Sequence, residues 1–179
     1  MNIGSFKGQF YKLKNKFTEV SMALCIVASV LITAIVVGWL FVAVLRAKMI
    51  SNVKSKYNFE ETCKKIEEVV PKGEGWGFPI PAWEFYESQI KKNLKYDNIK
   101  NCKIYFVCKS KYANQVVSDD PKWSGIMPCS WSVYELTNGD TYVAKMNIPL
   151  MSKMFTGVLG TVMSKVAKEE EEFIKAIAE

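Results

Sequence analysis

The hydrophobic pattern of the chain is dominated by residues 20–45, twenty-six consecutive positions without a charge. A bilayer core about 30 Å thick needs roughly 20 apolar residues in a helix, so the stretch predicts a transmembrane helix. A cleaved signal peptide is the main alternative, but its apolar core is roughly 7–15 residues long and precedes a small-residue cleavage site. A buried core helix is the other alternative. We expect the helix to be retained as an anchor.

Shorter periodic patterns divide the rest of the chain into small elements. Helical spacing predicts helices over residues 58–70, 82–94, 110–117 and 149–155, and a long last helix after residue 157. Period-two alternation predicts strands over residues 103–108, 128–136 and 141–147, the last two joined by an Asn138-Gly139 turn. This order indicates an α+β fold with a small, largely antiparallel sheet and helices packed on it.

These patterns divide the chain into four segments. Residues 1–19 are a Lys-rich leader, either a short amphipathic helix or a disordered tail, and residues 20–45 are the transmembrane helix. Residues 46–56 are a basic juxtamembrane linker that we expect to prolong the helix. Residues 57–179 are the soluble α+β domain. Within it, Asn58 is a candidate helix cap, Cys63 is expected in the core, residues 119–125 read as a loop, and the glutamates at 169–172 as a solvated face.

The net charge of +6 comes from a collar of basic residues that flank the predicted transmembrane helix. Residues 57–179 carry 16 Lys against 17 acidic residues, whereas basic residues flank the span on both sides, four before and four after. Lys12, Lys14, Lys16, Arg46 and Lys48 are therefore candidate contacts for anionic headgroups. With a single arginine in the chain, nucleic-acid binding is not expected. Because the numbers of basic residues before and after the span are equal, they do not determine the orientation of the helix in the membrane. A short leader before a large domain favours a single-pass protein of a prokaryotic inner or plasma membrane, with its domain on the extracytoplasmic side.

The chain lacks the residues that several kinds of active site require. The chain has no histidine, which removes His-based triads and His-ligated metal sites. None of its five cysteines forms a Cys-x-x-Cys motif, and no glycine-rich phosphate loop is present. No cofactor is indicated by any motif.

The second half of the chain has a cysteine that ends one strand, a Pro-Cys that opens the next, and an Asn-Gly-Asp turn, here at Cys108, Pro128-Cys129 and residues 138–140. This set of features resembles the domain of unknown function 302 family. The chain departs at Ser110, where the family usually has proline, and at Ser130, where it usually has arginine. The resemblance implies a small α+β domain over about residues 57–179 and a dimeric habit in some members. It implies no agreed activity.

Cys108 and Cys129 are the sharpest candidate site, because one ends a strand and the other begins one. Two thiols at one sheet edge could form a disulfide or bind a soft metal such as Cu(I), with thioether ligands from Met127, Met146 or Met151. Two inert buried cysteines are the plainer interpretation.

We therefore expect a non-enzymatic, membrane-anchored accessory or binding domain. It would self-associate or belong to a larger membrane complex, with a small apolar or soft-metal ligand near Cys108 and Cys129. The alternative is a thiol-redox protein that uses the same two cysteines.

Overall fold

The computed structural model describes residues 3–179, with side chains for residue 22 and from residue 24 onward, in two compact units, residues 1–47 and 48–179. The first unit is α1 (Ile3–Lys48), a single helix without a break between the leader and the apolar stretch. Its residues Leu24–Lys48 are long and apolar enough to cross a membrane, and none of that window is buried. This finding is consistent with an anchor or with a signal sequence.

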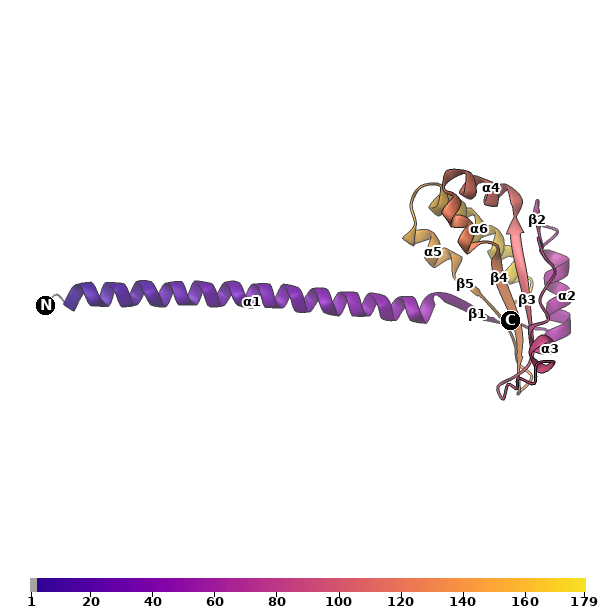
Figure 1. The fold of residues 1–179 in the computed structure, drawn as a ribbon, viewed down its shortest axis with the longest axis horizontal. Helices are drawn as coiled ribbons and strands as arrows, with labels where there is room; N and C mark the ends of the chain where they lie inside the picture. Colours follow the sequence, from indigo (N-terminus) through magenta and orange to yellow (C-terminus); the bar gives the residue numbers. More distant parts are fainter. Residues whose placement is uncertain (1–2) are drawn as a thin grey trace. The chain divides into compact units, whose positions relative to one another are not determined.

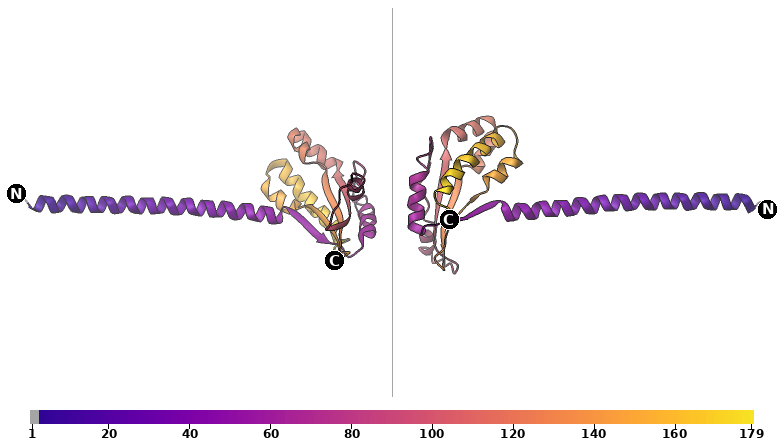
Figure 2. Two further views of the ribbon diagram at one scale, coloured as in Figure 1. Left: turned by 60° about the horizontal axis from the view of Figure 1, so that its bottom comes forward. Right: turned by 180° about the vertical axis from the view of Figure 1, so that it is seen from behind.

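The second unit is built on a five-stranded antiparallel sheet in the order β1-β5-β4-β3-β2 (Figures 1 and 2). Its strands are β1 (Ile50–Lys54), β2 (Trp76–Gly77), β3 (Ile99–Lys109), β4 (Cys129–Leu136) and β5 (Thr141–Met146). The helices are α2 (Phe59–Val69), α3 (Phe85–Ile90), α4 (Ser110–Asp119), the 3-10 helix η1 (Pro121–Ile126), α5 (Ile148–Met154) and α6 (Gly157–Lys175). The predicted α+β class and antiparallel sheet are confirmed.

One face of the sheet carries the core. Strand register aligns Tyr105 with Trp131 and Trp131 with Lys145, so their side chains leave the sheet on the same side. Tyr105 and Trp131 are almost completely buried there. The Phe173 ring of α6 packs against Trp131, and the Tyr105 hydroxyl donates to Glu67 of α2. Both helices therefore cover this face, and Cys63 lies in the core as expected.

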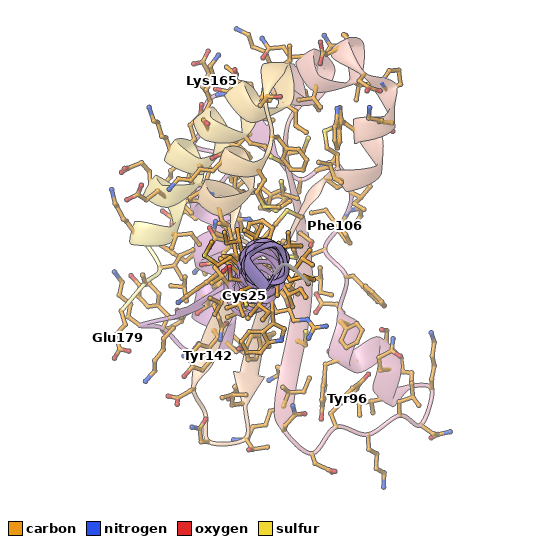
Figure 3. The ribbon with its side chains drawn as sticks, turned by 90° about the vertical axis from the view of Figure 1, so that its left-hand side faces the viewer. Cys25, Tyr96, Phe106, Tyr142, Lys165 and Glu179 are labelled. Atoms are coloured by element: carbon orange, nitrogen blue, oxygen red, sulfur yellow. The ribbon has the colours of Figure 1, made fainter. Side chains whose placement is uncertain are left out.

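Local sequence explains where the helices begin. The Asn58 side chain accepts from the Glu61 backbone N–H at 2.9 Å, which confirms the predicted cap of α2. Lys165 projects from α6 to solvent, and Tyr96 lies in the loop that connects α3 to β3 (Figure 3).

Three sequence predictions of local structure are wrong. Of residues 46–56, which were expected to prolong the helix, only 46–48 do so: α1 ends at Lys48, and β1 then pairs with β5. The helix predicted over residues 82–94 is only the short α3, because Trp83 is held in a β-bridge to Ile104 and Asn93 takes a left-handed backbone. Residues 119–125, predicted as a loop, lie mostly within η1.

Candidate functional site

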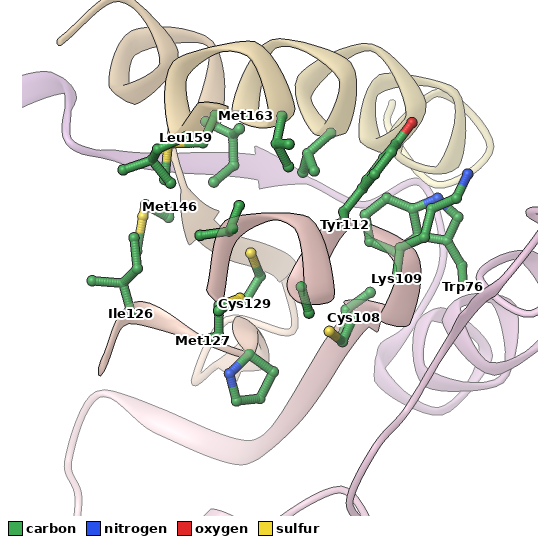
Figure 4. Close-up of a pocket in the computed structure, with 17 residues that line it drawn as sticks. Trp76, Cys108, Lys109, Tyr112, Ile126, Met127, Cys129, Met146, Leu159 and Met163 are labelled. Carbon is green, nitrogen blue, oxygen red and sulfur yellow. The ribbon is translucent and has the colours of Figure 1, made fainter. Parts of the chain in front are cut away.

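A cavity of about 60 Å³ lies where the end of β3 and the start of β4 meet α4 and α6 (Figure 4). Buried residues of α4 and α6, such as Val116 and Val162, form part of its wall, and the other lining residues come from β2, β3, β4, β5, η1, α4, α5 and the segment before β4. The lining is almost wholly apolar. The lining residues are Trp76, Val107, Cys108, Lys109, Tyr112, Ala113, Val116, Ile126, Met127, Pro128, Cys129, Met146, Ile148, Leu159, Val162, Met163 and Val166.

Chain connectivity brings these residues together. β3 runs into α4 without a loop, so Cys108 and Lys109 at the strand end lie next to Tyr112 in the first turn of the helix. β4 begins at Cys129, directly after a cis Met127-Pro128 peptide bond. The cavity therefore lies at the sheet end where β3 finishes and β4 starts.

Four of the five predicted sulfur residues border this cavity. Cys108, Met127, Cys129 and Met146 all line it, whereas Met151 packs against the core outside the lining. The two cysteines are not direct partners across the strands. Cys129 is paired with Val107, so Cys108 is one residue out of register with it, although both residues line the cavity. All five cysteines, each within the described residues, are free thiols.

The thiols are held in their protonated form. Burial raises the pKa of Cys63, Cys102 and Cys108 above the ordinary value. Burial, reinforced by the nearby negative charge of Glu170, raises the pKa of Cys129 to about 12. Thiolates are the species that attack disulfides and bind soft metals, and the raised pKa values make the thiolate form scarcer at neutral pH. Among the described residues, no three His, Cys, Asp or Glu side chains are grouped to hold a metal ion.

Glu169 joins the elements at one side of the cavity. Its carboxylate accepts hydrogen bonds from the Trp76 indole, the Tyr112 hydroxyl and the Lys109 ammonium, the last at 2.8 Å. These donors come from β2, α4 and β3, and all three residues line the cavity. Burial acts to raise the pKa of Glu169, but the three donors outweigh it, and the pKa lies below its ordinary value.

A buried ion pair lies next to Cys129. Glu170 and Lys145 are 2.6 Å apart, with side chains only 1% and 9% exposed, and the Trp131 indole donates to Glu170 at 3.4 Å. Burial raises the pKa of Glu170, against the opposing charge of Lys145.

The expected solvated face at residues 169–172 is therefore wrong for its first two members. Charge suggested solvent, but Glu170 lies at helical spacing from the buried residues Val166 and Phe173 of α6. That spacing was the signal that could have revealed it. Of the predicted headgroup contacts, Arg46 and Lys48 have exposed side chains, and those of Lys12, Lys14 and Lys16 lie outside the described side chains.

The fold and the site define a small α+β domain that encloses an apolar cavity beside two engaged carboxylates. The chain belongs to the DUF302 family, described as a domain of unknown function, which matches residues 51–179. No curated protein matches the chain.

A solved structure shares the fold. It is the crystal structure of the uncharacterized conserved protein DUF302 from Bacillus stearothermophilus, with a TM-score of 0.61 and 22% sequence identity. The match covers 72% of this chain and 97% of that one. The likeness supports the fold of the domain and says nothing of a ligand.

Proposed function

We propose that this chain is a single-pass membrane-anchored binding domain whose cavity holds a small apolar ligand. The observation that carries the proposal is the chemistry of the cavity wall. Its aliphatic and thioether side chains offer apolar contact, and the thiols of Cys108 and Cys129 are kept neutral. Concave, mostly apolar sites of this kind bind small molecules, and flexible methionines adapt to their shape.

The apolar side chains of the candidate span in α1 are exposed, and none of that span is buried within the protein, which supports a membrane anchor. Alkaline extraction of membranes should leave the protein in the pellet, and its intact mass should include the residues of α1. Release into the supernatant, or a mass lacking the N-terminal segment, would show a cleaved signal instead. We place the domain on the extracytoplasmic side, where external protease should degrade it in spheroplasts.

Self-association, as a homo-oligomer or within a larger membrane complex, is supported by small residues along α1. Ser29, Ala34 and Gly38 permit close approach of a second helix, and a side chain added at Gly38 would meet nothing within 4 Å in this chain. Native mass measurement in mild detergent should give a multiple of the chain mass or a larger complex, and Gly38→Leu should weaken this association. A monomer at all concentrations would contradict this part.

The cavity can be tested with xenon, a probe that engineered apolar cavities are known to bind. The full chain, labelled with ¹³C at its methionine methyl groups, would be titrated with xenon in lipid nanodiscs. We expect saturable shifts at the lining residues Met127, Met146 and Met163, and none at Met154, which is exposed and outside the lining.

A matched pair of variants on α4 provides the control. Ala113 lines the cavity and is only partly buried, so Ala113→Leu should fill the cavity without unfolding the domain and should abolish the shifts. Its neighbour Asn114 is exposed and outside the lining, so Asn114→Leu should leave the shifts unchanged. Shifts that are absent in the native chain, or that survive Ala113→Leu, would refute a binding cavity.

A further inference from the structure

The cavity lies at the end of the sheet where the domain begins. Ile50 at the start of β1 is aligned with Met146, which lines the cavity. The next residue, Asn147, is tied to the chain before β1: its backbone N–H donates to the Met49 carbonyl and its side-chain amide to the Lys48 carbonyl, both at 2.8 Å. The first residues of the domain therefore run beside the cavity wall.

The covalent connection to the anchor is as short as it can be. The candidate span ends at Lys48, and Met49 follows it directly. If α1 spans a bilayer, as the proposed function holds, this end of the domain is tethered within reach of the bilayer surface. Met49 and Ile50 are 40% and 58% exposed there, and the exposed Lys48 can contact headgroups.

The polar side chains at the edge of the cavity already have a hydrogen-bond partner within the domain. The Trp76 indole, the Tyr112 hydroxyl and the Lys109 ammonium are all engaged by Glu169. Ligand sites that orient a polar molecule present a few polar groups aimed inward. This cavity presents apolar contact alone, which matches a segment of plain hydrocarbon.

We infer that the cavity takes the end of an acyl chain from a lipid of the bilayer that anchors the domain. The inference rests on the proposed function and names the ligand class of the same cavity. Its volume is about 60 Å³, on a scale where a single water needs roughly 10–15 Å³. That space accepts a chain end and not a whole lipid. Displacement of the flexible Met127 and Met146 side chains lengthens the accepted segment.

Spin-labelled lipids test the inference in the full chain. The methionine-labelled protein would be placed in nanodiscs containing phosphatidylcholine with a nitroxide either at the end of an acyl chain or on the headgroup. Met163 is buried against the cavity, so an inserted chain end brings its nitroxide closer to the Met163 methyl group than a headgroup nitroxide can come. We expect the chain-end label to weaken the Met163 methyl signal more strongly than the headgroup label does.

The two label positions are compared in the native chain, so the result does not depend on any variant. Ala113→Leu should restore the Met163 signal, and Asn114→Leu should not. A Met163 signal that the chain-end label weakens no more than the headgroup label does, while xenon still shifts it, would overturn the acyl-chain inference and leave the binding cavity standing. Loss of both effects would overturn both proposals.

Discussion

The buried pair of Lys145 and Glu170 allows a sharp test of what holds the core together. Lys145→Met removes the charge and leaves an apolar side chain of similar length on β5. Glu170 then remains, 1% exposed, with only the Trp131 indole as a donor at 3.4 Å. An uncompensated buried carboxylate must either stay charged at high cost or take up a proton.

The magnitude follows from the geometry. At 2.6 Å the attraction between the two charges is about 6 kcal/mol for an effective dielectric constant of about 20. Desolvation of each ion costs several kcal/mol and offsets most of that gain. Removing one partner forfeits the attraction while the other remains buried, so Lys145→Met should cost about 3–5 kcal/mol. Replacing both, as Lys145→Met with Glu170→Leu, should return the stability to within about 1 kcal/mol of the native chain or above it.

The assay is urea unfolding of the full chain in detergent, followed by tryptophan fluorescence, for the native chain, both single variants and the double variant. The interaction energy from this cycle isolates the pair. Single variants within about 1 kcal/mol of the native chain, or a double variant as unstable as both singles together, would refute the reasoning.

Two further predictions concern the elements around the cavity. Because the folded-state pKa of Glu169 lies below its ordinary value of 4.5, its contribution is present above that pH and lost as pH falls through the folded pKa. Glu169→Gln should therefore cost about 1 kcal/mol at pH 7, discounted for partial exposure, and the difference from the native chain should shrink below pH 4.5 in urea unfolding. A gap that stays constant with pH would assign the effect to packing instead. A Cβ at Gly160 would lie against the Phe155 carbonyl oxygen, so Gly160→Ala should lower the unfolding free energy by about 1–3 kcal/mol. The exposed Lys165→Ala on the same helix should change it by less than about 0.5 kcal/mol, and equal effects of the two would contradict the close contact.

The parts of the fold that sequence predicted are those whose pattern is local. β4 and β5 alternate with period two and are joined by the Asn138-Gly139 turn, which alone specifies a hairpin. β1 has no such signal. Its sequence, Ile-Ser-Asn-Val-Lys, follows an apolar helix directly, and it becomes a strand only because β5 offers a partner. Edge strands of this kind are set by tertiary pairing and not by propensity.

The same distinction between local pattern and tertiary contact applies to the candidate site. Cys108 and Cys129 could be placed at one sheet edge from strand boundaries, but which face each side chain takes depends on register, which no motif encodes. The cavity itself depends on how α6 crosses the sheet end. Sequence reasoning therefore brought the sulfur residues to one sheet end and left both an apolar and a soft-metal ligand open, because the burial of the thiols depends on tertiary packing.

Glu170, which the sequence analysis placed on a solvated face, and its partner Lys145 both depart from the patterns of their elements. Lys145 follows Thr141 and Val143 on the core side of β5, and Glu170 falls on the apolar stripe of α6 between Val166 and Phe173. Each violates the pattern of its own element, and the two violations have opposite sign. A charge at a core position is tolerable only if it is paired, so two opposite violations in one small domain predict each other as partners. Rule-breaking positions of this kind gather at functional or strained sites. Here the charge of Glu170 acts on Cys129 in the cavity wall, so the pair lies next to the site that we propose.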